Sequence, residues 1–454
     1  MTQLATLIQQ AADALFMPWL LLLLFGTGIF LTIRFRFVQV RRFPEAVRTM
    51  FAVPDAGAGG ALTPFQAFMT ALSGTIGTGN IAGVATAIVS GGPGALFWIW
   101  AYGFVAMAIK FAEAVLGVTW RETKGGTLLA GPMYVLRDGL RSPRLAATYA
   151  LVAGVAAVTT TPFTQPNSIA VVLESQLGMP TWVAGIGIAV LTWLVIIGGI
   201  KSIGRVAETL APLKVSLYLG GRLFVIVAFA SRIPDVLSLV LAEAFSMRAA
   251  AGGGIGMFIA MRYGLARGMY ANEAGYGTAS VAYGTARSAR PERQGLHAVM
   301  EVFIVSFVTS TISAMTILLT GVWQSGLTST AAVAEAFDMA LPGVGGYVVA
   351  LCAFLFGYTT LIGWAFYGEQ FFEYLFGVRV TVPYRWLYCL LIPFGAVARV
   401  DVVWAWGDLM NALQIFPNII GVIGLSGFAA RVALGRGLTN AQEAAPPGPT
   451  VGRT

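Results

Sequence analysis

The sequence predicts an all-α polytopic membrane protein, a fold class indicated by its composition, its repeated apolar segments and two glycine-rich interruptions. Of 454 residues, 57% are hydrophobic and 11% are charged, and the mean hydropathy is +0.77. A soluble domain carries about 25% charged residues. About 20 apolar residues are enough to cross the bilayer as a helix. About eleven transmembrane helices are expected, near residues 14–33, 63–90, 94–120, 145–169, 180–200, 208–230, 252–284, 297–322, 345–376, 384–400 and 403–430.

The first apolar segment, 14–33, is followed rather than preceded by basic residues, which run from Arg34 to Arg48. It lacks the positive start of a secretory signal peptide, and the N-terminus is expected outside the cell. The C-terminus is then cytoplasmic, and most of the 28 Lys and Arg fall in cytoplasmic loops of a protein in the cytoplasmic (inner) membrane. The net charge of +8 therefore indicates orientation rather than a nucleic-acid partner. Residues 438–454 are Pro- and Ala-rich, and we expect a disordered cytoplasmic tail.

Two apolar segments contain clusters of residues that weaken helices. ALSGTIGTGNIAGVATAIVS covers Ala71 to Ser90, and AGGGIGMFIAMRYGLARGMYANEAGYGTAS covers Ala251 to Ser280. After a peripheral helix at 14–33, ten spans divide into five plus five, and each interrupted segment opens one half. Because five is odd, the halves form an inverted repeat, 63–230 and 252–430, within one transporter domain, 1–437. Interrupted helices at corresponding positions of inverted halves indicate the central site of a secondary transporter.

Two alternatives compete with this interpretation of the glycines. They could serve only to let helices pack closely, although matching interruptions in both halves argue against that. A phosphate-binding loop would need a preceding strand and a soluble βαβ unit, which this apolar sequence does not offer.

An interrupted helix in the middle of the bilayer leaves backbone groups that need partners. The amino end of the second half offers N–H groups to a carboxylate, and the carboxyl end of the first half offers carbonyl oxygens to a cation. Thr and Asn add oxygens without bringing charge into the membrane. The stretch SGTIGTGN, Ser73 to Asn80, is therefore predicted to bind a zwitterion and a cation.

Several stretches together resemble the alanine/glycine:cation symporter family, the sodium:alanine symporters. They are SGTIGTGNIAGVATAI, GGPGALFWIW, RGMYANEAGYGTA, GYTTLIGWAFYGE and GDLMNALQIFPN, which follow in order through nearly the whole chain. The resemblance implies a LeuT-type fold with one peripheral helix before the five-plus-five inverted repeat. It also implies symport of alanine or glycine with Na⁺, or less often with H⁺.

The resemblance further implies roles for individual residues. The amides of Thr78 and Gly79 would hold the substrate carboxylate, and Asn80 would give an oxygen to substrate or cation. Gln165 resembles a glutamine that contacts substrate, and Trp364 would form a wall of the pocket. The implied substrate residues are Thr75, Thr78, Gly79, Asn80, Gln165, Thr360 and Trp364. The implied Na⁺ ligands come from Ser73, Ile76, Asn80, Thr359 and Thr360, with a further carbonyl near Thr75.

Two departures from the family pattern bear on coupling and on the pocket. Val305 stands where the family usually has an acidic residue, so that any coupling role of this carboxylate is lost or has moved to Glu301, one helical turn earlier. Prolines flank Gln165 on both sides, within Thr159 to Pro166. The pocket is therefore expected to differ from a plain alanine site.

Ionisable residues within apolar segments are candidates for function. The gating or coupling candidates are Glu273, Arg267 and Glu301. For Glu273, structural pairing with Arg262 or Arg267 is favoured over direct contact with substrate.

Four further charged residues receive structural interpretations. Lys110 and Glu113, three residues apart on one helix, are expected to pair with each other. Lys214 and Arg222 are expected to extend their charged ends toward the membrane surface.

The expected protein is a secondary active symporter that imports a small neutral amino acid with Na⁺, acts as a monomer and uses no cofactor. A H⁺-coupled or exchange-mode carrier of the same fold is the alternative, favoured by the missing acid at Val305. An intramembrane enzyme would need a nucleophile–base pair or a metal cluster, and the chain has one histidine and two cysteines. A channel would use a ring of pore-lining groups, usually in an oligomer, whereas two different interrupted helices indicate a site within one protomer.

Overall fold

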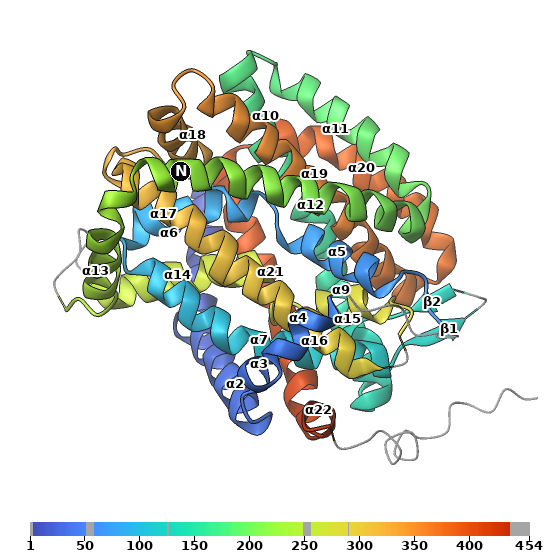
Figure 1. Cartoon of the computed structure of the whole chain (residues 1–454). Coiled ribbons are helices and arrows are strands. Elements are labelled where there is room, and N and C mark those ends of the chain that lie inside the picture. The colour runs from blue at the N-terminus through green and yellow to red at the C-terminus, as the bar shows by residue number, and fades with distance from the viewer. Residues whose placement is uncertain (1–2, 51–58, 125–126, 248–255, 289, 436–454) are drawn as a thin grey trace, which may run out of the picture.

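The computed structural model describes residues 3–50, 59–124, 127–247, 256–288 and 290–435, and these form helices almost throughout (Figure 1). The expected tail, 438–454, lies outside the described residues. The helices up to residue 244 are α1 (Gln3–Leu15), α2 (Leu21–Arg34), α3 (Val38–Arg41), α4 (Phe43–Thr49), α5 (Pro64–Thr75), α6 (Ala82–Gly91), α7 (Ala95–Thr119), α8 (Pro132–Tyr134), α9 (Pro143–Thr159), α10 (Thr161–Leu177), α11 (Thr181–Ile196), α12 (Gly199–Ala228) and α13 (Ile233–Ala244). The later helices are α14 (Gly256–Asn272), α15 (Thr278–Gly284), α16 (Pro291–Phe303), α17 (Ser310–Thr320), α18 (Ser329–Ala340), α19 (Gly345–Phe376), α20 (Thr381–Val397), α21 (Val400–Gly424) and α22 (Ser426–Ala433).

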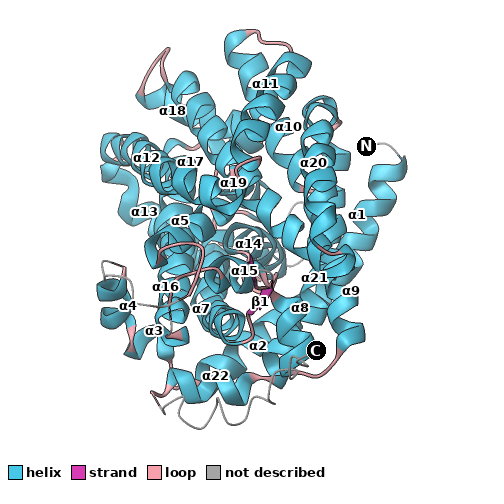
Figure 2. Cartoon of the chain, turned by 90° about the vertical axis from the view of Figure 1, so that its right-hand side faces the viewer, coloured by secondary structure: helices cyan, strands magenta, loops and turns pink. Residues whose placement is uncertain are grey.

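Helices of membrane-crossing length confirm the predicted class. Among the described residues, seven helical segments are long and apolar enough to span a bilayer, and nine if each of two bent helix pairs forms one span. The exact number of eleven, the inverted repeat and the positions of the termini relative to the membrane stay predictions. The strands β1 (Glu122–Lys124) and β2 (Thr127–Leu129) form a short antiparallel pair, visible as the small magenta element in Figure 2.

The outer helices carry large apolar side chains on their exposed faces. Leu22 on α2, Leu194 on α11, Val227 on α12 and Leu390 on α20 are 60% to 71% exposed. In water such a surface would be costly, whereas in a bilayer it faces lipid tails of similar polarity. Inside this layer, α7 packs against α14, α15 and α16, and α19 packs against α5, α9, α10 and α12.

The first predicted interruption is confirmed between α5 and α6. Helix α5 begins with a capping box, in which the Thr63 hydroxyl and the Gln66 side chain each accept a hydrogen bond from the other residue's backbone N–H. The helix ends at Thr75, and the chain then passes through an extended Gly77 and a short 3₁₀ turn, Thr78–Asn80. The two helical halves meet at an angle of 62°.

The second predicted interruption is confirmed between α14 and α15. Helix α14 ends at Asn272, and three of the next five residues, Glu273, Gly275 and Gly277, have positive φ angles. Glycine adopts this left-handed conformation without steric cost, whereas Glu273 adopts it against the usual preference of its residue type. Both interruptions lie inside the helix bundle, where α5 and α15 contact each other.

Two uninterrupted helices complete the surroundings of the first interruption. The polar stripe that contains Thr359, Thr360 and Trp364 lies on α19, which is helical from end to end. Gln165 lies on α10, which continues through Pro166 and is separated from α9 only by Thr160. Since α19 packs against both α5 and α10, these side chains meet at the interruption.

Candidate functional site

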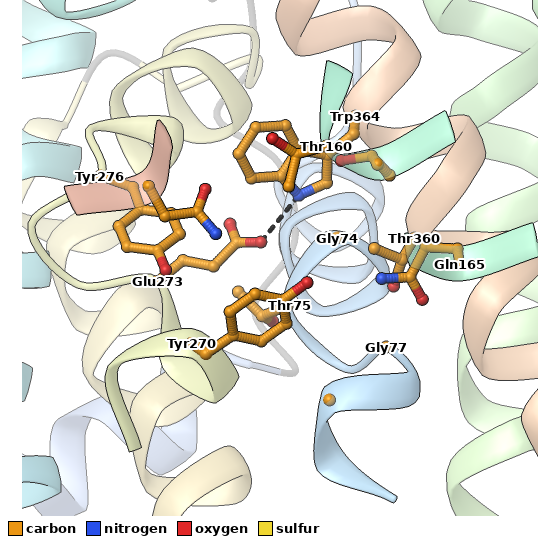
Figure 3. A pocket seen from close by; sticks show the side chains of 13 residues that line it. Gly74, Thr75, Gly77, Thr160, Gln165, Tyr270, Glu273, Tyr276, Thr360 and Trp364 are labelled. Carbon is orange, nitrogen blue, oxygen red and sulfur yellow. Dashed lines mark hydrogen bonds between the residues drawn. The ribbon is translucent and has the colours of Figure 1, made fainter. Parts of the chain in front are cut away.

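A small cavity lies beside the first helix interruption, between α5, α10, α14 and α19 (Figure 3). The residues that line it are Gly74, Thr75, Gly77, Gly79, Thr160, Thr161, Gln165, Tyr270, Glu273, Tyr276, Thr360, Trp364 and Asn411. The volume of the cavity is only about 20 Å³. This is room for about one water molecule, and a bound amino acid would require the walls to move apart.

The amino end of the second half-helix faces Gln165. The backbone N–H and the hydroxyl of Thr78 both donate to Gln165 Oε1, at 3.1 and 2.9 Å. Half-helix amides at such an end favour an anion, yet the acceptor present is a neutral amide oxygen. A carboxylate brought by a ligand would make a stronger, charge-assisted hydrogen bond to the same groups.

Two positions of this interruption require glycine because neighbouring side chains approach their backbone closely. A Cβ atom on Gly77 would lie 2.7 Å from Thr360 Oγ1, and one on Gly79 would lie 2.6 Å from the ring of Tyr270. Any larger residue would push these cavity walls outward. The glycines therefore let side chains from α14 and α19 touch the backbone of the turn.

A carboxylate lies on the opposite side of the cavity. Glu273 Oε1 accepts a hydrogen bond of 2.7 Å from the indole N–H of Trp364, and Glu273 Oε2 accepts one of 2.8 Å from Thr278 Oγ1. Figure 3 shows Glu273 and Tyr276 on one side, and Gln165 and Thr360 on the other. The cavity thus has on one side Gln165, which covers the Thr78 amide, with the backbone of Gly77 and Gly79, and on the other side a carboxylate that suits a cationic group.

The oxygens expected to ligate Na⁺ surround the ammonium of Lys214. Lys214 Nζ donates to the carbonyl of Ile76 at 2.7 Å, to Thr359 Oγ1 at 2.5 Å and to the carbonyl of Ser73 at 3.3 Å. The Thr360 hydroxyl also donates to the Ser73 carbonyl, at 2.9 Å. The structure therefore brings four of the five expected residues together, with a lysine between three of them.

Asn80 lies apart from the Lys214 ammonium. Its side-chain N–H donates to the carbonyl of Thr75 at 2.8 Å, and its own carbonyl accepts from the hydroxyls of Tyr218 and Ser313, each at 3.0 Å. Its side-chain oxygen is buried and makes no hydrogen bond within the described part of the chain. Asn80 thus braces the turn and keeps one oxygen available.

A buried ion pair connects the two interruptions. Lys110 Nζ lies 2.8 Å from Glu301 Oε1 and 2.5 Å from the carbonyl of Asn272, the last residue of α14. The same Glu301 oxygen accepts from Thr75 Oγ1, at the end of α5, at 2.9 Å, and Tyr283 donates to the other oxygen. Glu301 is therefore well placed for coupling, although it lies outside the cavity.

The amino end of α15 has a carboxylate of the protein itself. Glu113 Oε1 accepts from the backbone N–H groups of Gly275 and Gly277 at 3.0 and 3.1 Å, and from Asn418 Nδ2 at 2.6 Å. Glu113 is fully buried. The second interruption therefore has its anion built in.

The structural interpretations of four charged residues on α7 and α12 are wrong. Lys110 does not pair with Glu113, because the two side chains reach opposite ends of the second interruption. Lys214 and Arg222 do not extend to the membrane surface: both are fully buried, Lys214 against backbone carbonyls and Arg222 over the ring of Tyr218.

The structural pairing expected for Glu273 is also wrong. Arg267 instead pairs with Asp408, at 3.1 Å, and Arg262 pairs with Asp13. Arg267 lines a separate surface hollow, so that it lies outside the cavity. Glu273 is left to face the cavity with Trp364 as its partner.

Sequence reasoning missed several residues that the structure places at the site. Thr160, Tyr270, Tyr276 and Asn411 line the cavity, and Lys214 fills the expected cation position. Lysine within an apolar segment was the one available signal, because an intramembrane charge implies a function or a buried partner. The two tyrosines and Asn411 gave none, since their facing depends on packing.

Membrane-crossing helices, interrupted at a buried polar cavity, define a multi-pass membrane transporter. Comparison with known proteins makes this assignment specific. The sodium:alanine symporter family matches residues 1–435, and the chain belongs to this family. The protein is accordingly a transporter of the amino-acid:cation symporter type, and not an enzyme.

Two relatives and one solved structure illustrate the similarity. The sodium/alanine symporter AgcS of Methanococcus maripaludis is 38% identical over 420 residues, which cover 90% of this chain and 92% of AgcS. The probable sodium/glutamine symporter GlnT of Bacillus subtilis is 32% identical over 415 residues, which cover 91% and 88% of the two chains. A manganese transporter of Eremococcus coleocola, solved with an aromatic bis-isothiourea compound, has the same fold, with a TM-score of 0.59, 14% identity and coverage of 84% and 89%.

Proposed function

We propose that this protein imports a small neutral amino acid, alanine or glycine, across the cytoplasmic membrane by symport with a monovalent cation, Na⁺ in the first instance. One observation carries the proposal: the cavity at the first interruption has half-helix amides on one side and the Glu273 carboxylate on the other. A zwitterionic amino acid needs this pair of opposite charges at close spacing. The chain belongs to the sodium:alanine symporter family, and its relative AgcS is named a sodium/alanine symporter. Both findings favour alanine as the substrate.

The substrate carboxylate would replace Gln165 Oε1 at the amide of Thr78 and would also reach the amide of Gly79. The substrate ammonium would lie near Glu273. Tyr270 and Trp364 also line the cavity, which leaves little space for a side chain. This supports a small substrate, although the name of GlnT makes glutamine the relevant competitor to test.

Transport requires the site to open alternately to the two sides of the membrane. The walls come from helices far apart in the sequence, including α5, α10, α14 and α19, so that a movement of one helix group against another would open the cavity. The cavity as it stands admits about one water molecule. It corresponds to a closed conformation between two open ones.

The coupling ion has two candidates. Na⁺ would either use the carbonyls of Ser73 and Ile76 with the hydroxyls of Thr359 and Thr360, which needs Lys214 to withdraw, or bind elsewhere in the protein. A H⁺-coupled or exchange-mode carrier is the second candidate, and the contacts of Lys214 with these oxygens favour it. In both cases one protomer contains all the groups involved, which supports a functional monomer.

Uptake by purified protein in liposomes tests the proposal. Labelled alanine and glycine are offered under an inward Na⁺ gradient or an inward H⁺ gradient, with unlabelled glutamine as competitor. We expect accumulation of alanine under one of the two gradients, and its loss in Asn80→Ala, which removes the side-chain donor to the Thr75 carbonyl. Absence of accumulation under both gradients would contradict symport of small neutral amino acids.

A further inference from the structure

Lys214 is anchored at the carboxyl end of α5 rather than loosely placed near it. Its ammonium donates three hydrogen bonds, to the carbonyls of Ser73 and Ile76 and to Thr359 Oγ1. The side chain is fully buried, and its ammonium lies 5.2 Å from the centre of the Phe356 ring. An ammonium has three N–H donors, and each one has an acceptor here.

The charge of Lys214 is balanced by backbone dipoles. In the part of the chain that the structure describes, no carboxylate pairs with its ammonium. The partial negative charge at the carboxyl end of a helix stabilises a cation. The end of α5 thus holds one positive charge, supplied by the protein, at the oxygens that would otherwise suit a bound ion.

We propose that Lys214 is the resident cation of the first interruption, and that its ammonium excludes Na⁺ from the oxygens of Ser73, Ile76 and Thr359. The lone pairs that would ligate Na⁺ already accept hydrogen bonds from Nζ, and two positive charges at contact distance repel each other strongly in a buried site. Any Na⁺ that drives transport then binds elsewhere in the protein. This inference rests on the proposed function only where it treats these oxygens as a candidate site for the coupling ion. Whether Lys214 occupies them does not depend on transport.

A sodium-binding measurement tests the proposal without transport. Binding of ²²Na⁺ to the purified protein is counted per chain for wild type, Thr359→Val, Lys214→Ala and the double variant Lys214→Ala/Thr359→Val. We expect Thr359→Val to leave Na⁺ binding by the wild type unchanged. We expect Lys214→Ala to bind about one additional Na⁺ per chain, and the double variant to lose it, because the vacated oxygens then form a cation site.

Two controls separate the charge at this position from general damage. Lys214→Met keeps approximately the length of the side chain but removes its charge. It should also gain Na⁺ binding, and it replaces Lys214→Ala in the test if the alanine variant does not fold. Lys201→Met removes an exposed lysine near the start of the same helix, α12, and should bind Na⁺ as the wild type does.

Two results would overturn the proposal. One is a loss of about one Na⁺ per chain when Thr359→Val is introduced into the wild type, which would mean that Na⁺ uses this site despite Lys214. The other is a folded Lys214 variant that gains no Na⁺. Since no gradient or substrate is present, either result leaves symport intact, and a failure of alanine uptake leaves these counts unaffected.

Discussion

At the interruption between α14 and α15, two side chains of α7 contact the freed backbone groups at both ends. Lys110 donates to the carbonyl of Asn272 at the end of the first half, and Glu113 accepts from the amides of Gly275 and Gly277 before the second half. One helix therefore supplies an ammonium and a carboxylate, the two groups of a zwitterion, in fixed positions.

At the interruption between α5 and α6, the two ends are treated differently. The carboxyl end again receives an ammonium, that of Lys214. The amino end receives the neutral oxygen of Gln165 instead of a carboxylate, and the cavity lies beside it. The comparison gives a reason why the proposed substrate would bind at the first interruption and not at the second: a substrate carboxylate can displace an amide oxygen, whereas it would have to displace the buried, charged Glu113 from α15.

Three further carbonyls of the second interruption also have side-chain partners. Tyr102 donates to Ala274, Asn418 to Gly275 and Tyr149 to Tyr276, at 2.7 to 2.9 Å. Tight fixation of this kind suits an element that supports the site. The Lys110–Glu301 pair then connects this fixed element to Thr75 beside the cavity.

Removal of the Glu113 carboxylate is expected to destabilise the protein most, because it takes away the anion that distinguishes the second interruption from the first. In Glu113→Ala, the amides of Gly275 and Gly277 and the Asn418 side chain lose a buried charged acceptor, which we expect to cost about 3–5 kcal/mol of stability. Thermal unfolding of the purified protein measures this loss. Glu113→Gln keeps an acceptor oxygen and should lose much less, and a stable Glu113→Ala would show that the second interruption does not depend on its built-in carboxylate.

Loss of the ammonium at the same interruption should have the next largest effect. Lys110→Met leaves Glu301 buried without its cation, and we expect a destabilisation of about 3 kcal/mol. The double variant Lys110→Met/Glu301→Gln removes both charges, so that its destabilisation should be smaller than the sum of the single effects by at least about 1 kcal/mol. Additive effects in this double-mutant cycle would mean that the ion pair does not link the two elements.

The interruptions themselves could be predicted from sequence, whereas the groups that occupy them could not. SGTIGTGN concentrates glycine and hydroxyl residues in an apolar segment, and NEAGYG does so less strongly; such local signals are sufficient to end a helix. The glycine at position 77 is explained only by the structure, because its missing Cβ makes room for Thr360 on a helix nearly 300 residues away in sequence.

The partners of the buried charges depend on which way each helix faces. Lys110 and Glu113 are neighbours on α7, and helical spacing alone predicts a local pair. In the structure Lys110 contacts Asn272 and Glu301, 162 and 191 residues away. Helix α7 is apolar and buried on nearly all sides, so that it has no amphipathic pattern to indicate its facing. Helix α12 is apolar on its exposed face too, as Leu213 and Val227 show, so that no polar stripe indicated the facing of Lys214.

Replacing the neutral acceptor Gln165 with a charged glutamate should give the amino end of the first interruption a carboxylate of the protein, as in the second interruption. Gln165→Glu places a carboxylate at the amide of Thr78, where it would occupy the position proposed for the substrate carboxylate. We expect binding of labelled alanine to weaken at least about tenfold, or 1.4 kcal/mol, with the fold retained. Gln176→Glu makes the same change on the same helix, three turns further on, and should bind alanine normally.

Unchanged alanine affinity in Gln165→Glu would contradict the proposed position of the substrate carboxylate. A variant that unfolds would instead show that the first interruption tolerates no fixed negative charge. The thermal unfolding of the variant, measured without alanine, distinguishes these two results.

The smallest effect is expected where the cavity can offer water as a substitute. Trp364→Phe keeps an aromatic wall and removes the indole N–H that donates to Glu273 Oε1. Glu273 retains the hydroxyl of Thr278, and the cavity has room for about one water molecule. We therefore expect a cost of about 1 kcal/mol, or about a fivefold weaker binding of alanine in an equilibrium binding assay. A loss as large as that of Gln165→Glu would mean that the orientation of Glu273 decides substrate binding as much as the amino end of the half-helix does.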